Sequence, residues 1–317
     1  MRKIKVKFVD QWTGHCPECD KFYKILCKNY DVELSDMPDY LFDGGLGHEH
    51  FKYDCIKILW VGENVVPDFN SFDYAVGFDY LEFMDRYLRV PLYVFNEAFP
   101  ALAQRQTPPA NDLLLNRKFC SYVVSNGGRA DPIREQFFHK LNRYKRVDSG
   151  GRFLNNMGGP VPNKEVFCRQ YKFNIAFENS SSPGYTTEKM VQPLSYFSLP
   201  IYYGDPLVAR DFNLESMVRV AGIDDVERAI EEIIRLDKDD EAYIRRVTSP
   251  CLVRPIDYYE KALESFLIHI VEQPLDVARR LNRYGFQPVL RHRLRRLYKI
   301  EDAIRCPVRL LRRLKWF

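Results

Sequence analysis

The sequence predicts an α/β protein in which parallel sheets carry helices on both faces, arranged as two successive blocks. Apolar runs typical of strands recur at residues 4–9, 56–61, 74–78, 92–95, 122–125, 173–177 and 199–203. Helical patterns lie between several of these runs, at residues 133–144 and 188–197. Strands that alternate with helices are typical of parallel sheets, because a parallel neighbour is reached through a long crossover connection.

The length and composition fit two globular domains. The chain has 317 residues, of which 46% are hydrophobic and 28% are charged, and these are ordinary values for folded proteins of this size. A polar, proline-containing stretch at residues 104–116 is the best candidate for a linker. We therefore expect an N-terminal domain over residues 1–115, a C-terminal domain over residues 116–278 and a tail over residues 279–317.

The first block begins at the amino end of the chain. Residues 3–9 alternate charged and apolar side chains and predict a strand, whereas a signal peptide has an apolar core and a small-residue cleavage site. No run reaches the roughly eighteen apolar residues that cross a bilayer, so we expect a cytoplasmic protein. The second block closes with helices expected at residues 225–236, 239–246 and 255–271.

One pair of cysteines has the spacing of metal ligands. Cys16 and Cys19 form a CxxC motif, and His48 and His50 would complete a zinc site with them. A single CxxC without a second one is a weak signal, however. We expect reduced thiols that bind no metal.

The tail carries most of the positive charge. From Arg279 onward it holds eleven Arg and two Lys against two acidic residues, a net charge of +11, while the rest of the chain has a net charge of −7. Apolar residues mark one helical face, and Pro307 is expected to interrupt the helix before a second apolar stripe; the two stripes are Leu290, Leu294, Leu297, Tyr298 and Ile304, then Val308, Leu311, Leu314, Trp316 and Phe317.

This pattern favours a helix that lies on an anionic membrane surface, which would be the cytoplasmic face of the inner membrane. The alternatives are a helix packed on the body and a nucleic-acid contact. The acidic body would repel phosphates, so we expect no nucleic-acid partner.

The segment after residue 177 combines features of an anion site. A strand ends at Phe177, a polar loop follows, and a helix begins near Thr187, which can cap it. Ligands of parallel sheets bind at the carboxyl ends of strands, where helix N-termini favour phosphate. Lys189 adds a positive charge, and Glu188 can accept hydrogen bonds from sugar hydroxyls. The alternative is a capped surface helix with no ligand.

The same segment resembles a known family. FNIAFENSSSPGYTTEK at residues 173–189, followed by LPIYYGDP at 199–206, is similar to the donor-binding signature of the bacterial α-1,3-fucosyltransferases. WVGEN at 60–64, FDYAVGFD at 72–79 and DRYLRVPLY at 85–93 resemble their acceptor domain, as shorter stretches at 8–12, 119–126, 132–134 and 147–151 resemble other parts. The resemblance covers the chain up to residue 270 or so.

The resemblance implies a GT-B type fold, with two Rossmann-like domains facing each other across a cleft. The N-terminal domain would bind the acceptor and the C-terminal domain GDP-fucose. The implied reaction moves L-fucose from GDP-β-L-fucose to a hydroxyl, expected to be O3 of GlcNAc or Glc in an N-acetyllactosamine- or lactose-type acceptor, with inversion to an α-fucoside in one displacement.

The resemblance also assigns residues. Glu63 matches the family's proposed base, and we expect Trp60 and its aromatic neighbours to bury it. The donor-binding positions it implies are Arg134 and Lys189 on the pyrophosphate, Asn179 on a phosphate, and Tyr185 and Glu188 on the ribose or near the fucosyl ring. Glu178 points away from its neighbour Asn179 in a strand-to-loop turn, so we rank it as a supporting residue.

The resemblance implies that no metal or other cofactor is required. The adjacent pairs Asp224–Asp225 and Asp239–Asp240 lie in acidic helical stretches rather than after a strand, so cations are expected to stabilise the leaving GDP. Tandem heptads, which some bacterial members carry before the tail, are absent from this sequence, so dimerisation through such repeats is not implied.

Three other functions stay open at this point. One is a GT-B transferase that uses another nucleotide sugar, and the second is a non-catalytic protein that binds nucleotides or glycans. The third is a membrane- or RNA-binding protein whose function depends on the basic tail. The residues leave open a 1,3 or 1,4 linkage and an acceptor on lipopolysaccharide, on a milk-type oligosaccharide or in a capsule repeat.

Overall fold

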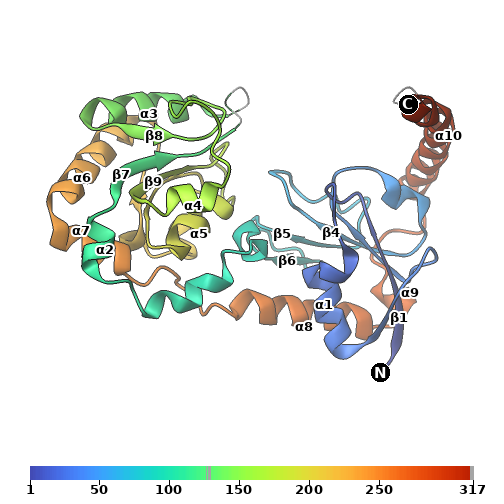
Figure 1. Ribbon diagram of the computed structural model, residues 1–317. Helices are drawn as coiled ribbons and strands as arrows, with labels where there is room; N and C mark the ends of the chain where they lie inside the picture. The colour runs from blue at the N-terminus through green and yellow to red at the C-terminus, as the bar shows by residue number, and fades with distance from the viewer. Residues whose placement is uncertain (126, 128–129, 315–317) are drawn as a thin grey trace. The chain divides into compact units, whose positions relative to one another are not determined.

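The structure is a computed structural model that describes residues 1–125, 127 and 130–314, with the side chains of 104, 106 and 301–314 outside the description. The second apolar stripe expected in the tail therefore lies outside the described side chains. The chain divides into two compact units (Figure 1). Unit 1 comprises residues 1–77, 81–90 and the chain from Glu260 onward, and unit 2 comprises residues 78–80 and 91–259.

Unit 1 is built on a six-stranded sheet in which every pairing is parallel. Its strands are β1 (Lys3–Val9), β2 (Asp31–Leu34), β3 (Tyr40–Asp43), β4 (Ile56–Trp60), β5 (Tyr74–Gly77) and β6 (Tyr87–Arg89), in the order β2-β1-β3-β4-β5-β6. Val9 pairs with Asp43 in the register of β1 and β3. The residues that follow these strands therefore meet at the carboxyl edge of the sheet.

Helices from both ends of the chain cover this sheet. α1 (Lys21–Asn29) is capped by Asp20, whose side chain accepts a hydrogen bond from the N–H of Phe22, and it buries Phe22, Ile25 and Leu26. α8 (Tyr258–Glu272) belongs to unit 1 from Glu260 onward and lies against the same sheet. The hydroxyl of Tyr40 in β3 donates a hydrogen bond to the Val271 carbonyl of this helix at 3.3 Å. The short α9 (Leu275–Ala278) and the long α10 (Phe286–Leu314) follow.

Unit 2 holds a second parallel sheet of five strands. They are β7 (Lys118–Tyr122), β8 (Val147–Ser149), β9 (Tyr171–Phe177), β10 (Leu199–Tyr203) and β11 (Val218–Arg219), in the order β11-β10-β9-β7-β8. β9 is buried along its whole length, as expected for a central parallel strand with helices on both faces.

The two faces of β9 pack on different helices (Figure 1). Phe173, Ile175 and Phe177 join a core with α3 (Ile133–Tyr144), α6 (Val226–Lys238) and α7 (Asp240–Thr248). On the other face lie α4 (Lys164–Cys168) and α5 (Glu188–Ser195). The predicted α/β class, with two parallel sheets and helices on both faces, is therefore confirmed as a GT-B-like fold.

Several local predictions were wrong. Residues 92–95, expected as a strand, form a buried 3₁₀ helix after Pro91, because a four-residue apolar run does not distinguish the two. β7 ends at Tyr122, where the run 122–125 was expected to begin. α10 continues through Pro307 instead of stopping there.

The compact units also differ from the boundaries expected at residues 115 and 278. The proposed linker belongs to unit 2, where the buried Arg105 donates to the carbonyls of Leu194 and Val247 at 2.5 and 2.6 Å. α2 (Asn111–Leu115) follows in the same unit. The chain from Glu260 to 278 belongs to unit 1. The alternation of strands and helices in the sequence could not predict this, because it does not tell which of the two sheets a helix covers.

Candidate active site

The candidate donor site lies in the loop between β9 and α5. β9 ends at Phe177, and α5 begins at Glu188 after the N-cap Thr187, whose side chain accepts a hydrogen bond from the Lys189 N–H. β9 is the central strand of its sheet. The loop therefore lies at the carboxyl edge of a parallel sheet, beside a helix N-terminus, as the sequence predicted.

Glu178 is the centre of this loop. Its side chain is 0% exposed. One carboxylate oxygen accepts from the Thr187 N–H at 2.7 Å, and the Thr187 hydroxyl lies 2.8 Å from each of the two oxygens. The Lys189 ammonium is 3.1 Å away. Burial raises the pKa of Glu178, while the charge of Lys189 opposes this rise. Glu178 thus joins the end of β9 to the first turn of α5.

Lys189 lies between two carboxylates. Its Nζ is 3.1 Å from Glu178 and 3.2 Å from Glu188. Burial would lower the pKa of Lys189, but the two carboxylates outweigh it and raise the pKa. Burial would raise the pKa of Glu188, but Lys189 and Lys164 lower it. The site therefore holds a charged lysine and an ionised Glu188, whose side chain is 36% exposed and can accept hydrogen bonds from a ligand.

Two glycines permit this geometry. Gly184 has a φ of +83°, and a Cβ atom there would lie 2.3 Å from the Phe78 carbonyl oxygen. A Cβ on Gly204 would lie 2.5 Å from Cγ of Glu178. Only glycine avoids both contacts, so these positions shape the loop around Glu178.

Arg134 lies beneath the loop rather than at its surface. It is 2% exposed on α3, and it donates to the Glu178 carbonyl from Nε at 3.0 Å and to the Phe177 carbonyl from Nη2 at 2.5 Å. The sequence predicted a cation that contacts pyrophosphate. In the structure Arg134 satisfies two carbonyl groups at the end of β9, which holds the loop in place.

The other predicted donor residues belong to the same loop. The backbone carbonyl of Asn179 accepts from the Asp131 N–H at 2.9 Å, and the Asp131 side chain accepts from the Tyr203 hydroxyl at 2.5 Å. Tyr185 is 5% exposed and packs edge-on against Phe78 with ring centroids 5.3 Å apart. All the predicted unit 2 residues therefore lie on or directly against the loop between β9 and α5.

Sequence reasoning missed Lys164 and Asp131. Lys164 begins α4 and interacts electrostatically with Glu188, and burial lowers its pKa. Asp131 ties the loop to β10 through Tyr203. Asp131 could have been found from the sequence, because it precedes Pro132 at the start of a predicted helix. Nothing in the local sequence around Lys164 indicates that this lysine lies near Glu188.

Glu63 lies in unit 1, in the turn that follows β4. Its side chain is exposed, so the expected burial by Trp60 was wrong. Trp60 packs edge-on against Trp12 with centroids 5.6 Å apart. Glu63 and Trp60 line a pocket of about 270 Å³ together with Val66, Ser71 and His50. Aromatic and apolar walls with a few polar groups are typical of sites for small ligands such as sugars.

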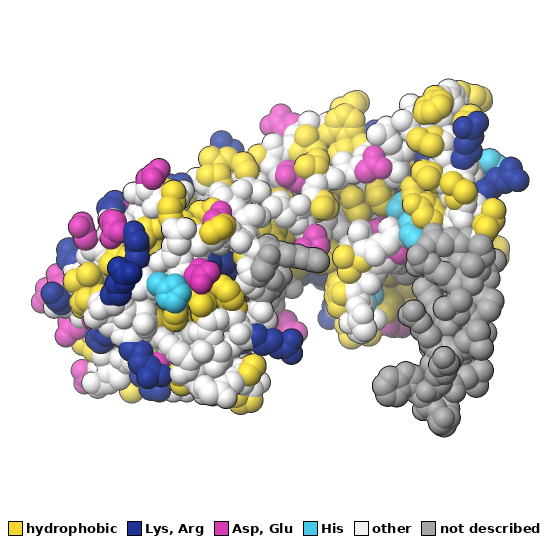
Figure 2. All heavy atoms as spheres, turned by 90° about the horizontal axis from the view of Figure 1, so that it is seen from above, with side chains coloured by type: hydrophobic (Ala, Val, Ile, Leu, Met, Phe, Trp, Pro, Cys, Tyr) yellow, Lys and Arg dark blue, Asp and Glu magenta, His cyan; other side chains and the backbone are white. Residues whose placement is uncertain are grey.

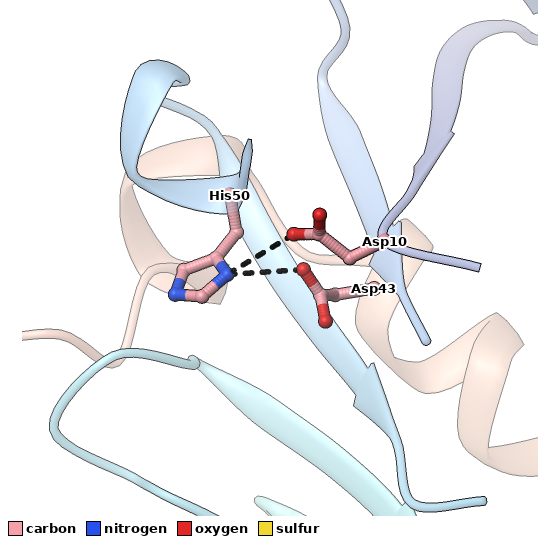
Figure 3. A group of neighbouring side chains, drawn as sticks. All are labelled: Asp10, Asp43 and His50. Carbon is pink, nitrogen blue, oxygen red and sulfur yellow. Dashed lines mark hydrogen bonds and ion pairs between the residues drawn. The ribbon is translucent and has the colours of Figure 1, made fainter. Parts of the chain in front are cut away.

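A buried cluster of Asp10, Asp43 and His50 lies against this pocket (Figure 3). Nδ1 of His50 is 3.0 Å from Oδ2 of Asp43 and 3.6 Å from Oδ2 of Asp10. Burial would lower the pKa of His50, but hydrogen bonds to the two carboxylates raise it. Burial raises the pKa of Asp43 to about 6.

These three residues are a group that could hold a metal ion, because their ligand atoms lie within 4.8 Å of one another. The carboxylates also have hydrogen bonds of their own: Asp10 accepts from the Glu49 N–H and Asp43 from the Gly45 N–H, each at 2.6 Å. Nδ1 of His50 is thus directed at carboxylates rather than at the CxxC motif. His48 stacks on Tyr298 with ring centroids 3.7 Å apart, and Cys16 and Cys19 are exposed free thiols.

Comparisons with known proteins agree with this arrangement. Residues 6–96 match the family described as the α-(1,3)-fucosyltransferase FucT N-terminal domain, and residues 115–247 match the glycosyltransferase family 10 (fucosyltransferase) C-terminal domain. The chain is 36% identical to the α-(1,3)-fucosyltransferase FucT of Helicobacter pylori over 262 residues, which are 70% of this chain and 54% of that protein. It spans about half the length of the curated relatives it matches.

Solved structures show the same likeness. A crystal structure of α1,3-fucosyltransferase with GDP-fucose superposes with a TM-score of 0.72 at 30% identity, covering 86% of this chain and 92% of the other. A crystal structure with GDP gives a TM-score of 0.69 at 29% identity, with coverages of 83% and 91%.

Proposed function

We propose that this chain, which belongs to the glycosyltransferase family 10 fucosyltransferases, transfers L-fucose from GDP-β-L-fucose to a hydroxyl of an N-acetyllactosamine- or lactose-type acceptor. The observation that carries the proposal is the buried cluster of Glu178, Thr187 and Lys189 at the carboxyl edge of β9. A protein of known structure that is 30% identical over most of both chains was crystallised with GDP-fucose.

The donor is assigned to unit 2. Glu188 is placed to accept hydrogen bonds from ribose or fucosyl hydroxyls, because Lys189 and Lys164 keep it ionised. The same two lysines, with Arg134, supply positive charge for the pyrophosphate. Asn179 and Tyr185 are proposed to contact the donor from the loop. Because Lys189 already pairs with two carboxylates, we assign it a second role, which is to orient Glu188.

The acceptor is assigned to unit 1, with Glu63 as the base. In a single displacement, Glu63 takes the proton of the acceptor hydroxyl as that oxygen bonds to C1 of fucose. The bond between C1 and the β-phosphate oxygen breaks at the same time, and GDP leaves with the electron pair. Attack from the face opposite GDP gives the α-fucoside. The pocket that Glu63 shares with Trp60 is proposed to hold the acceptor sugar.

Two further parts of the proposal concern metal and membrane. We expect no metal requirement, because the cations of unit 2 can balance the charge of departing GDP. Among the described helices none is both long enough and apolar enough to span a bilayer. We propose that α10 binds an anionic membrane surface, since Leu297 and Ile300 are 60% and 57% exposed on a helix rich in arginine.

The test begins with the donor. Binding of GDP-fucose, GDP-mannose and UDP-galactose is measured by calorimetry, and then transfer to a panel of lactose and N-acetyllactosamine acceptors is measured by mass spectrometry. The proposal predicts binding of GDP-fucose and a product heavier by one fucose. Equal use of another nucleotide sugar would favour a different GT-B transferase, and binding without any product would favour a non-catalytic protein.

A further inference from the structure

Unit 1 contains a second pocket, on the opposite edge of its sheet from Glu63. It has a volume of about 470 Å³ and lies near the amino ends of β4 and β5, against the segment that leads into α10. Six basic side chains line it: Lys57, Arg279, Arg283, Arg291, His292 and Arg295. By contrast, basic and acidic side chains are interspersed on the visible face of unit 2, the lobe that carries α3 and α6 (Figure 2).

The two acidic residues of this pocket already have partners. Oδ1 of Asp73 accepts from the N–H groups of Arg280 and Leu281 at 2.8 Å each, and Oδ2 accepts from the Lys57 N–H at 2.9 Å. Asp54 pairs with Arg279 at 2.5 Å. The carboxylates therefore organise the backbone and one arginine, and the pocket keeps an excess of positive charge.

Lys57 is the most informative of the cations. It is 7% exposed, and within the described part of the chain its ammonium group has no hydrogen-bond acceptor or carboxylate at bonding distance. Burial lowers its pKa, and the nearby Asp73 and Asp54 oppose this shift without reversing it. Arg283 and Arg295 likewise form no ion pair with a described residue. A buried ammonium without a partner is unfavourable, so an anion that enters this pocket gains more than it would at the surface.

We propose that this pocket binds a phosphate group. A phosphate offers several charged oxygens, which suits one ammonium and the guanidinium groups that line the same pocket. Arg279 pairs with Asp54 and Arg291 donates to the carbonyls of Asn70 and Asn282, so Lys57, Arg283 and Arg295 are the cations left for the phosphate. The pocket exceeds the size of the phosphate alone, so the group can carry a substituent. Its source is either a free phosphate compound or a lipid headgroup. The proposal is independent of fucosyl transfer, because the donor is assigned to unit 2.

The test measures binding of inorganic phosphate and pyrophosphate to the full chain by calorimetry, without GDP, because GDP carries phosphates that could enter the pocket themselves; binding to unit 2 is recognised because it persists in the pocket variants. The variants are Lys57→Met, which removes a buried charge and keeps an apolar stem, and Arg295→Gln. The matched controls are Arg293→Gln and Arg296→Gln, since both are exposed arginines of α10 outside the pocket. We expect Lys57→Met to weaken phosphate binding about tenfold or more, and each control to change it by less than about twofold.

Vesicles distinguish the two sources. Flotation is measured with phosphatidylglycerol vesicles and with phosphatidylcholine vesicles. If a headgroup is the ligand, Lys57→Met and Arg295→Gln weaken binding to phosphatidylglycerol more than the controls do, and inorganic phosphate competes. If free phosphate is the ligand, the pocket variants lose phosphate and keep vesicle binding. The proposal is overturned if phosphate and pyrophosphate show no saturable binding, or if the controls lose as much as the pocket variants.

Discussion

The buried pair of Lys189 and Glu178 gives the most demanding prediction. Replacing Lys189 with Met leaves the Glu178 carboxylate, which is 0% exposed, without its countercharge. Removing one partner of a buried ion pair typically costs about 3–5 kcal/mol. Glu178 keeps its hydrogen bonds from the Thr187 N–H and hydroxyl, so we expect about 3 kcal/mol at pH 8.

The loss should depend on pH, with a definite sign. The pKa of Glu178 is already raised by burial and opposed by Lys189, so it rises further in Lys189→Met. Between the ordinary value of 4.5 and this higher pKa, the folded state binds a proton that the unfolded state has released. The free energy of unfolding of the variant therefore falls by up to about 1.4 kcal/mol per pH unit as pH rises.

The assay is urea unfolding of the wild type and the variant at pH 5, 6, 7 and 8. The control is Lys140→Met, which removes an exposed ion pair with Glu227 on the same unit. It should cost less than about 1 kcal/mol at every pH. A loss in Lys189→Met that is this small and independent of pH would refute the assignment of Glu178 as a buried carboxylate balanced by Lys189.

Three other changes have defined outcomes. Gly204→Ala places a methyl group 2.5 Å from Cγ of Glu178. We expect it to destabilise unit 2 by about 1–3 kcal/mol and to weaken GDP-fucose binding, as measured by thermal shift with and without GDP-fucose. An unchanged affinity for GDP-fucose would contradict the role of this contact. His50→Gln should make the free energy of unfolding depend less on pH. Because the pKa of His50 is raised in the folded state, protonated His50 stabilises the fold below the ordinary histidine pKa of 6.5, and this stabilisation of roughly 1 kcal/mol is lost at higher pH. If stability depends on pH as steeply in the variant as in the wild type, His50 is not the source of this pH dependence. Removing residues 301–317 should keep transfer to a free oligosaccharide within about twofold and reduce flotation with anionic vesicles; loss of both would mean that the tail serves the catalytic body.

The sequence was most informative where local chemistry determines local structure. The span of α3 matched its predicted range at both ends, because its apolar periodicity is long. α5 began where the Thr187 cap predicted it. β8 and β11 have three and two residues, which is too short for any period of side chains to be visible. They form because a neighbouring strand offers hydrogen bonds, and the local sequence does not contain that information.

The site shows the same division. The loop between β9 and α5 and its charged residues followed from composition and from a family resemblance. The burial of individual side chains did not follow from the sequence. Glu63 is exposed although Trp60 lies three residues before it, and Arg134 is 2% exposed on α3, which the pattern of the helix did not indicate. Burial depends on which distant segments cover a side chain, and Lys164 was missed for the same reason.

The central claim is that Glu63 is the base of a fucosyl transfer from GDP-fucose, and one measurement tests it most directly. Transfer to N-acetyllactosamine is measured in EDTA for the wild type, for Glu63→Gln and for Glu82→Gln, an exposed carboxylate of the same unit outside the pocket. We predict an α-fucosylated product with the wild type and Glu82→Gln, and a turnover lower by about 10²–10⁴-fold with Glu63→Gln, while GDP-fucose binding is unchanged. Equal turnover in the two variants would contradict the assignment of the base, and failure of the wild type to bind GDP-fucose would contradict the function itself.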